Sequence, residues 1–360
     1  MRPVYYLGIF IPLAVVVELA HANPVIVFGA AALGVIPCAA VMGEATEAIA
    51  ARTGPGIGGL LNVTFGNAPE LIIAFFALIE GLQEVVKASL VGSIIGNVLL
   101  VLGASMIVGG WGREKQEFSR TAASAQAAML TLAMAALVFP AIFELVHGGA
   151  LPPVGAEHVE FGSEVEHLSL GVALVLLVSY AAGLWFSLKT HRDVFNPYHD
   201  PEAEEHHPWS IKRAAIYLAL SAVAVGLMSE ILVGSITEAS DDIGLSEFFV
   251  GVFVVAIVGN AAEHWVAVLV AAKDKMDLAV NIAVGSSAQI ALFVAPVLVL
   301  LSFVVGDDPL ALVFNGYELG ALLFAVLIAN LVTQDGESNW FEGVQLVSLY
   351  AVLGLVFYYA

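Results

Sequence analysis

Long apolar stretches separated by short polar segments make up most of the chain. Eleven of these stretches are about 20 residues long, the length that an α-helix needs to cross the hydrocarbon core of a bilayer. The pattern therefore predicts an all-α polytopic membrane protein with eleven transmembrane helices, at 4–20, 25–50, 57–79, 85–110, 120–144, 168–189, 211–236, 245–270, 277–304, 316–333 and 339–359.

Composition supports a membrane protein and excludes several other classes. Of 360 residues, 60% are hydrophobic and 12% are charged, whereas a soluble domain has about 25% charged residues. The net charge of −20 comes without a basic patch, which excludes nucleic-acid binding. The chain has no Walker-type phosphate loop, so we expect neither an enzyme nor an ATP-driven pump. Only Arg2 precedes the first stretch, which has no small-residue cleavage site, so we expect a retained helix and not a signal peptide.

The basic residues predict the orientation of the chain. If the eleven stretches cross alternately, one side receives eleven Lys and Arg residues and the other receives only Lys87. Cytoplasmic loops have the excess of positive charge, so we predict a cytoplasmic N-terminus and an external C-terminus. The eleven residues on the predicted cytoplasmic side are Arg2, Arg52, Arg113, Lys115, Arg120, Lys189, Arg192, Lys212, Arg213, Lys273 and Lys275.

A short motif occurs twice, 193 residues apart. Residues 66–70 read Gly-Asn-Ala-Pro-Glu and residues 259–263 read Gly-Asn-Ala-Ala-Glu, and each motif is followed at the same distance by Gly-Ser. The copies lie five predicted spans apart, so the two halves would cross in opposite directions. An inverted-topology repeat of five plus five helices is typical of secondary transporters, in which the ion site lies near the midplane.

The repeat predicts the division of the chain into domains. We expect an N-terminal transmembrane helix (1–22), a first repeat (23–190), an acidic cytoplasmic linker (191–210) and a second repeat (211–360). The linker and the external loop 145–167 are rich in acidic residues and histidine. Such loops are usually solvated connections; the alternative is cation or proton sensing, since histidine titrates near neutral pH.

The repeated motifs supply candidate cation ligands. Glu70 and Glu263 are carboxylates within apolar spans, where ionisable groups are costly and usually functional. Residues three or four apart share a helix face, which adds Asn67, Asn260, Ser93, Asn97, Ser286 and Gln289 to the predicted site. These side chains form a set of hard oxygen ligands that suits Ca²⁺, while softer metals prefer histidine or cysteine.

The same residues also have alternative, purely structural interpretations. The glutamates would otherwise cap a neighbouring helix, and the serine and asparagine side chains would otherwise hold helices together. Pro69 lacks an N–H and should break its helix, which frees backbone carbonyls; Ala262 replaces it in the second copy.

Three acidic or basic side chains near the site have less definite roles. Glu47 and Glu238 are candidates for a gate or an entrance, or are solvated helix ends. His264 is interpreted first as a packing residue and second as a proton relay.

Two ionised glutamates in an empty site would repel each other and would take up protons, which a divalent cation would displace. Competition for one site with alternating access is sufficient for cation/proton antiport. We therefore predict proton exchange at Glu70 and Glu263.

At these motifs the sequence resembles the calcium/proton exchanger family of the cation/calcium exchanger superfamily. The resemblance implies an eleven-helix exchanger in which Glu70 and Glu263 bind the cation and exchange protons, helped by the amide and hydroxyl residues named above. Related sodium/calcium exchangers have serine or threonine where Asn67 and Asn260 stand, and often aspartate near Gln289, so the resemblance favours H⁺ as the coupling ion. The motifs are Gly43–Glu47, Gly58–Glu70, Lys87–Ser93, Gly259–His264 and Gly285–Ile290.

We therefore predict a plasma-membrane antiporter that exports Ca²⁺ in exchange for H⁺, without a resident cofactor. Other divalent cations stay open as cargo, and so does association into a homo-oligomer. The alternatives are a sodium-coupled calcium exchanger and, with less support, a cation channel.

Overall fold

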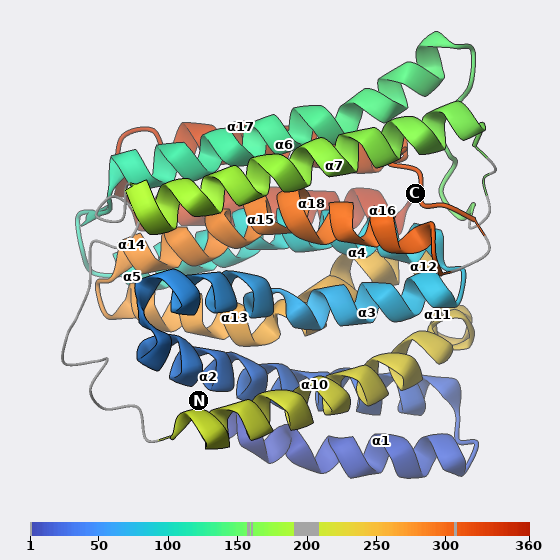
Figure 1. The fold of residues 1–360 in the computed structure, drawn as a ribbon, viewed down its shortest axis with the longest axis horizontal. Coiled ribbons are helices and arrows are strands. Elements are labelled where there is room, and N and C mark those ends of the chain that lie inside the picture. Colours follow the sequence, from blue (N-terminus) through green and yellow to red (C-terminus); the bar gives the residue numbers. More distant parts are fainter. Residues whose placement is uncertain (1, 157–158, 160, 191–208, 306–307) are drawn as a thin grey trace. The chain divides into compact units, whose positions relative to one another are not determined.

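The structure is a computed structural model that describes residues 2–156, 159, 161–190, 209–305 and 308–360. These residues are almost entirely helical (Figure 1). The predicted linker 191–210 falls outside the described residues except for its last two positions, as do Glu157, His158 and Glu160 of the predicted external loop.

The α-helices follow the apolar stretches closely. They are α1 (Phe10–Leu19), α2 (Pro24–Gly66), α3 (Ala68–Ile79), α4 (Gln83–Ile95), α5 (Leu102–Gly110), α6 (Arg120–Val146), α7 (Ser163–Trp185), α10 (Ile211–Gly234), α11 (Ile236–Ile243), α12 (Glu247–Phe249), α13 (Ala256–Ala272), α14 (Met276–Val280), α15 (Ser286–Gln289), α16 (Ala295–Ser302), α17 (Gly316–Val332) and α18 (Trp340–Tyr358).

Wider and tighter helical turns join several of these elements. A 3₁₀ segment, η1 (Arg2–Ile9), precedes α1, and five π-helical segments interrupt or extend longer helices. Such turns often occur at functional sites. The π segments are η2 (Gly96–Val101), η3 (Phe186–Thr190), η4 (Val250–Val255), η5 (Asn281–Gly285) and η6 (Ile290–Val294).

Within the described ranges, eight helices are long and apolar enough to span a membrane, and three shorter apolar helices accompany them. The chain is therefore a multi-pass membrane protein. The shorter helices are Val4–Leu19, Ala68–Ile79 and Gly316–Val332.

The connection between the second and third predicted spans has a different local structure from the one expected. We expected a connection near residues 51–56, but helical geometry continues through this segment to Gly66. The membrane-length part of α2 is Pro24–Thr53, and Figure 1 shows the ribbon reversing direction after it and before α3. The chain therefore changes direction between the two predicted spans while its backbone keeps helical geometry.

The chain divides into two compact units, and each takes segments from both sequence halves. The first unit comprises 1–76, 179–244 and 258–262, and the second comprises 77–178, 245–257 and 263–360. In the first unit, α10 packs along α2 (Figure 1). Their approach is close because Gly34 leaves room for Met228, whose Sδ would lie 2.8 Å from a Cβ at position 34.

In the second unit, α4 and η4 cross at very short range. A Cβ on Gly92 would lie 2.0 Å from the carbonyl oxygen of Val252, and a Cβ on Gly251 would lie 2.9 Å from the Cβ of Ala88. Small residues allow membrane helices to approach in this way. Gly92, half of the repeated Gly-Ser motif, thus has a packing role.

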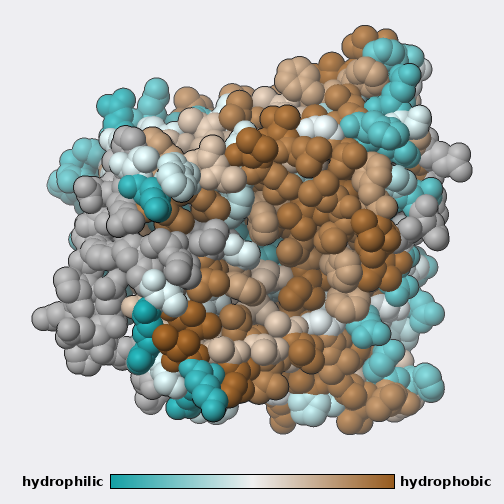
Figure 2. All heavy atoms as spheres, in the orientation of Figure 1, coloured by the Kyte–Doolittle hydropathy of each residue, from teal (hydrophilic) through white to brown (hydrophobic). Residues whose placement is uncertain are grey.

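The flanks of α6 and α7 in the second unit have the surface of a membrane protein. Figure 2 shows hydrophobic side chains along these helices and hydrophilic ones toward their ends. The exposed residues include Leu132, Phe139, Leu174 and Val175. Lipid tails would cover such residues, so their exposure here is expected.

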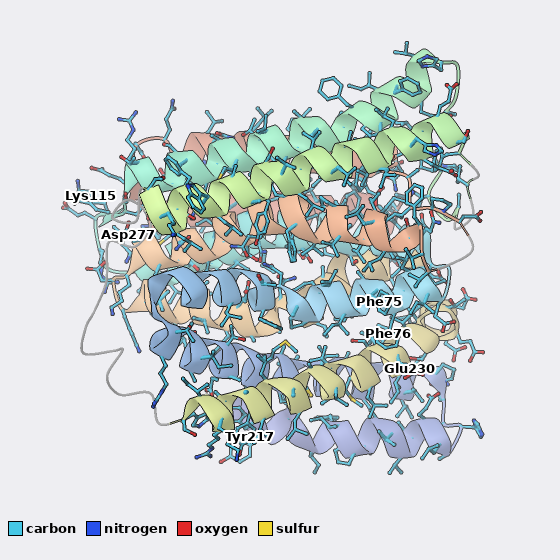
Figure 3. The ribbon with its side chains drawn as sticks, viewed as in Figure 1. Phe75, Phe76, Lys115, Tyr217, Glu230 and Asp277 are labelled. Carbon is cyan, nitrogen blue, oxygen red and sulfur yellow. The ribbon has the colours of Figure 1, made fainter. Side chains whose placement is uncertain are left out.

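Loops at one end of the second unit are tied together by hydrogen bonds and ion pairs. Strands β1 (Gln116–Glu117) and β2 (Glu337–Ser338) pair antiparallel, and Lys115 bonds Glu337 at 2.7 Å. Figure 3 shows Lys115 and Asp277 at this end. The hydrogen bond to Glu337, with a second to Glu117, raises the pKa of Lys115 above its usual range. Lys115 therefore stays positively charged at physiological pH.

Candidate functional site

The first copy of the motif lies at a helix break in the first unit. The helix α2 ends at Gly66, Asn67 leaves helical geometry (φ −97°, ψ 19°), and α3 begins at Ala68. Pro69 stands at the second position of α3, where its missing N–H costs nothing. The break predicted from Pro69 is confirmed, and it places Glu70 in the first turn of α3. The unsatisfied N–H groups and the helix dipole make this terminus favourable for negative charge.

The second copy is an unbroken helix. Asn260 and Glu263 both lie inside α13, which runs from Ala256 to Ala272. Ala262 replaces Pro69 here, so no N–H is missing and the helical hydrogen bonds continue. The wide turn of η4 comes directly before α13, so the second copy has its irregular backbone upstream of the motif.

The two copies of the motif meet inside the first unit. A Cβ on Gly259 would lie 3.3 Å from Cγ of Glu70 and 3.5 Å from Cδ1 of Ile73. The glycine of the second motif therefore lies against the glutamate side chain of the first, although they are 189 positions apart in the sequence. Asn67 and Asn260 are both buried.

We predict that this contact does not accept a larger side chain. Gly259→Val would force its methyl groups against Glu70. If the predicted exchange activity is present, we expect it to fall at least about tenfold, since a displacement of about 1 Å at a functional site has effects of this size or larger. The measurement is ion uptake by reconstituted protein. Gly226→Ala is the control, because its Cβ would meet only Phe76, at an ordinary 3.8 Å. Equal transport by both variants would contradict the prediction.

In the second unit, Glu263 has a partner from the predicted set. The hydroxyl of Ser286 donates to Oε2 of Glu263 at 3.1 Å. Ser286 and Gln289 are the first and last residues of α15, a single turn between η5 and η6. π-Helical turns on both sides separate this turn from the regular α-helix. The direction in which its side chains point therefore depends on those wider turns.

Asn97 does not lie in a regular α-helix as we expected. It is the second residue of η2, while Ser93 belongs to α4, so the shared face inferred from α-helical spacing is altered by a wider turn. The amide oxygen of Asn97 lies 3.0 Å from Nε2 of His264, a hydrogen bond when Nε2 bears the proton. Sequence reasoning gave His264 a packing role first and missed this partner; its position directly after Glu263 was the available signal.

The candidate gate residues are exposed. Glu47 lies on α2 and Glu238 on the short helix α11, and both side chains are accessible. Exposure is expected both for residues at an entrance and for residues at a solvated helix end, so both interpretations of these glutamates stay predictions.

No group of three or more His, Cys, Asp or Glu side chains in the part of the chain that the structure describes could hold a metal ion. A cation site on the predicted residues would therefore take most of its ligands from amide, hydroxyl and backbone oxygens. Calcium accepts such ligands, since it binds six to eight oxygens in flexible geometry.

Comparison with known proteins identifies the family. The family model described as sodium/calcium exchanger protein matches residues 23–189 and 213–359. The chain belongs to the sodium/calcium exchanger protein family. Each matched segment contains one copy of the repeated motif.

Members of the family are similar to this chain over its whole length. A Ca²⁺/H⁺ antiporter of Aphanothece halophytica is 42% identical over 98% of this chain and 95% of the relative. The Ca²⁺/H⁺ antiporter ChaA of Bacillus subtilis is 43% identical over 97% and 96%. The crystal structure of the Ca²⁺/H⁺ antiporter protein YfkE matches with a TM-score of 0.83 and 39% identity, over 100% of both chains.

Proposed function

We propose that this member of the family is a secondary active antiporter that exports Ca²⁺ in exchange for H⁺. The observation that supports this best is the identity of 42–43% to Ca²⁺/H⁺ antiporters over nearly the whole chain. The apolar helices support membrane transport. The predicted ligands are oxygen atoms, which suit calcium.

We further propose that Glu70 and Glu263 bind the cation, and that its binding displaces the protons that these glutamates hold when the cation is absent. The contact of Gly259 with the Glu70 side chain supports this, because it brings the two copies of the motif together. The hydroxyl of Ser286 would orient Glu263. Asn67, Asn260, Ser93, Asn97 and Gln289 complete the proposed ligand set.

The proposed antiport follows from charge. Two carboxylates and a divalent cation form a neutral set, and so do two carboxyls with protons. An empty site with two charges is costly inside a membrane. The site would therefore change sides mainly when it holds either Ca²⁺ or protons, which couples the two fluxes.

We propose eleven crossings with a cytoplasmic N-terminus in a plasma membrane. Contacts within each unit support the proposed alternation of crossings, because loops that bond each other are assigned to the same side of the membrane. Loops assigned to the cytoplasm bond each other through β1 and β2 and through Arg113 and Asp274. Loops assigned to the outside bond each other through Asn23 and Asp242 and through Glu84 and the backbone of Gly155.

An inverted repeat of 23–190 and 211–360 is part of the proposal. The π-helical segments support it, because η2 ends at Val101 and η6 ends at Val294, the same 193-residue offset as the motif. The units support it as well. The first unit contains all of α2 and α10, which would be equivalent spans, and the second contains α4 with α15 and α16.

Coupling can be tested in inverted membrane vesicles. We expect a proton gradient, acidic inside, to drive radiolabelled calcium uptake that collapses with a protonophore. A sodium gradient of the same size should drive no uptake, and its success would favour the sodium-coupled exchanger. Calcium entry without either gradient, down its own concentration gradient alone, would favour a channel.

A further inference from the structure

Lys87, the single basic residue assigned to the external side, is buried within the second unit. Its side chain is 7% exposed, and its ammonium donates to the carbonyl oxygen of Val313 at 3.1 Å. The ammonium also lies 5.5 Å from the ring centroid of Phe161. A buried ammonium needs such compensation, because isolated buried charges are very unfavourable.

Acidic side chains from two helices interact with this lysine, and a third acidic side chain interacts with one of them. Glu84 of α4 and Glu318 of α17 interact electrostatically with Lys87, and Glu247 of α12 interacts with Glu84. We name Glu84, Lys87, Glu247 and Glu318 the external cluster. The ammonium of Lys87 donates its hydrogen bond to a backbone carbonyl. Its positive charge therefore acts on both Glu84 and Glu318.

Glu318 is the most deeply buried acid of the external cluster, at 2% exposure. Its Oε2 accepts from the backbone N–H of Asn315 at 2.8 Å, while Asn315 Oδ1 caps the N–H of Glu318. Within the described residues its Oε1 has no hydrogen-bond partner. Glu84, by contrast, accepts from the backbone N–H of Gly155 at 2.7 Å.

Charge balance then indicates a bound proton. One ammonium interacts with two carboxyls, those of Glu84 and Glu318, so their complete ionisation would leave net negative charge in a buried site, which costs several kcal/mol per ion. The cost is lowest when the carboxyl with an unpaired oxygen is neutral, since leaving a charged group unpaired costs more than leaving a neutral one. Glu247 and Glu318 each have an oxygen without a hydrogen-bond partner within the described residues. Glu318 is the more deeply buried of the two, so its ionisation is the more costly.

We propose that the external cluster is a second proton-binding site, in which Glu318 holds a proton that is not exchanged for calcium. Glu318 receives its charge interactions from Lys87 and Glu84 of α4. The other helices packed against α17 are α6, η2 and α18; the titratable groups toward the external ends of α6 and α18 are Glu144, His147 and Tyr358, and η2 has none.

The proton would stabilise the external end of the second unit. Unfolded glutamate loses its proton near pH 4.3. If the folded protein keeps the proton on Glu318 above that pH, it binds more protons than the unfolded chain. Stability must then fall as pH rises, until Glu318 ionises in the folded state.

Infrared spectroscopy of the purified full-length protein tests the proposal without measuring transport. In saturating calcium at neutral pH, the proposed exchange glutamates should be ionised. We expect a protonated-carboxyl band to persist in the wild type and to lose intensity in Glu318→Gln. Glu342→Gln is the matched control, because Glu342 makes the same kind of capping box at the start of α18 and is only half-buried; it should leave the band unchanged.

Thermal unfolding provides a second readout. Glutamine imitates a neutral carboxyl, so Glu318→Gln should fold and should lose the decline in stability with rising pH that the wild type shows. Absence of the band in the wild type, its persistence in Glu318→Gln, or failure of this variant to fold would each overturn the proposal. Failure of calcium/proton exchange would not affect it.

Discussion

Replacing Glu70 or Glu263 by glutamine should reduce proton-driven calcium uptake in inverted vesicles to background. Each replacement removes one negative charge from the proposed site and also the group that exchanges a proton. A unit charge pair at 4 Å contributes about 4 kcal/mol at an effective dielectric constant of 20. This corresponds to a loss of about three orders of magnitude in affinity for a cation.

Two variants separate this effect from general damage. Glu230→Gln changes an exposed glutamate of α10 (Figure 3) and should transport normally. Glu70→Asp keeps the charge on a shorter side chain and should retain partial uptake with a higher calcium requirement. If Glu70→Gln or Glu263→Gln reaches the membrane at normal levels and still shows normal calcium uptake, the residue replaced is not part of the site.

A methyl group on Gly92 should destabilise the protein severely. In Gly92→Ala the Cβ would lie 2.0 Å from the carbonyl oxygen of Val252 and 2.8 Å from Cβ of Ala256. The first of these atoms is backbone within a helical segment, so it cannot turn away as a flexible side chain can. Overpacking typically costs about 1–3 kcal/mol, and separation of α4 from η4 would add lost packing to that cost. We expect a lower melting temperature and reduced yield in detergent.

Gly320→Ala is the matched control for Gly92→Ala. It lies in the interior of α17 in the same unit, and a Cβ there would have no heavy atom within 4 Å. Alanine in a helix interior is favoured over glycine by about 1 kcal/mol, so this variant should be as stable as the wild type or more stable. A stable Gly92→Ala protein would mean that α4 and η4 do not cross as closely as described.

Most of the predicted spans coincide with helices because their apolar residues extend over bilayer length. The observed α6, α10 and α18 start and end within two residues of the predicted limits. The predicted connection at 51–56 lies where the membrane-length part of α2 ends, but its backbone is helical and not an irregular loop. Local composition cannot distinguish these outcomes, because the direction of the chain after Thr53 depends on the helices packed around it.

The sequence predicted which residues belong to the proposed site better than it predicted their contacts. Repetition of the motif selected Glu70 and Glu263, and Pro69 correctly predicted the break that the structure places at Asn67. The hydrogen bond between His264 and Asn97 was not predictable, because it joins residues 167 positions apart and uses a π-helical turn. The external cluster was missed as well, although Lys87 had already appeared as the exception in the charge pattern.

By itself the sequence determined that this is a multi-pass helical membrane protein with a duplicated acidic motif. Helix length, apolar composition and a repeated pentapeptide are properties of the linear chain, and no contact is needed to recognise them. Only the tertiary structure decided which atoms meet: Gly259 against Glu70, Ser286 with Glu263, and Gly92 against Val252. These pairs depend on how helices distant in sequence pack, and packing is set by side-chain shape and backbone approach over the whole unit.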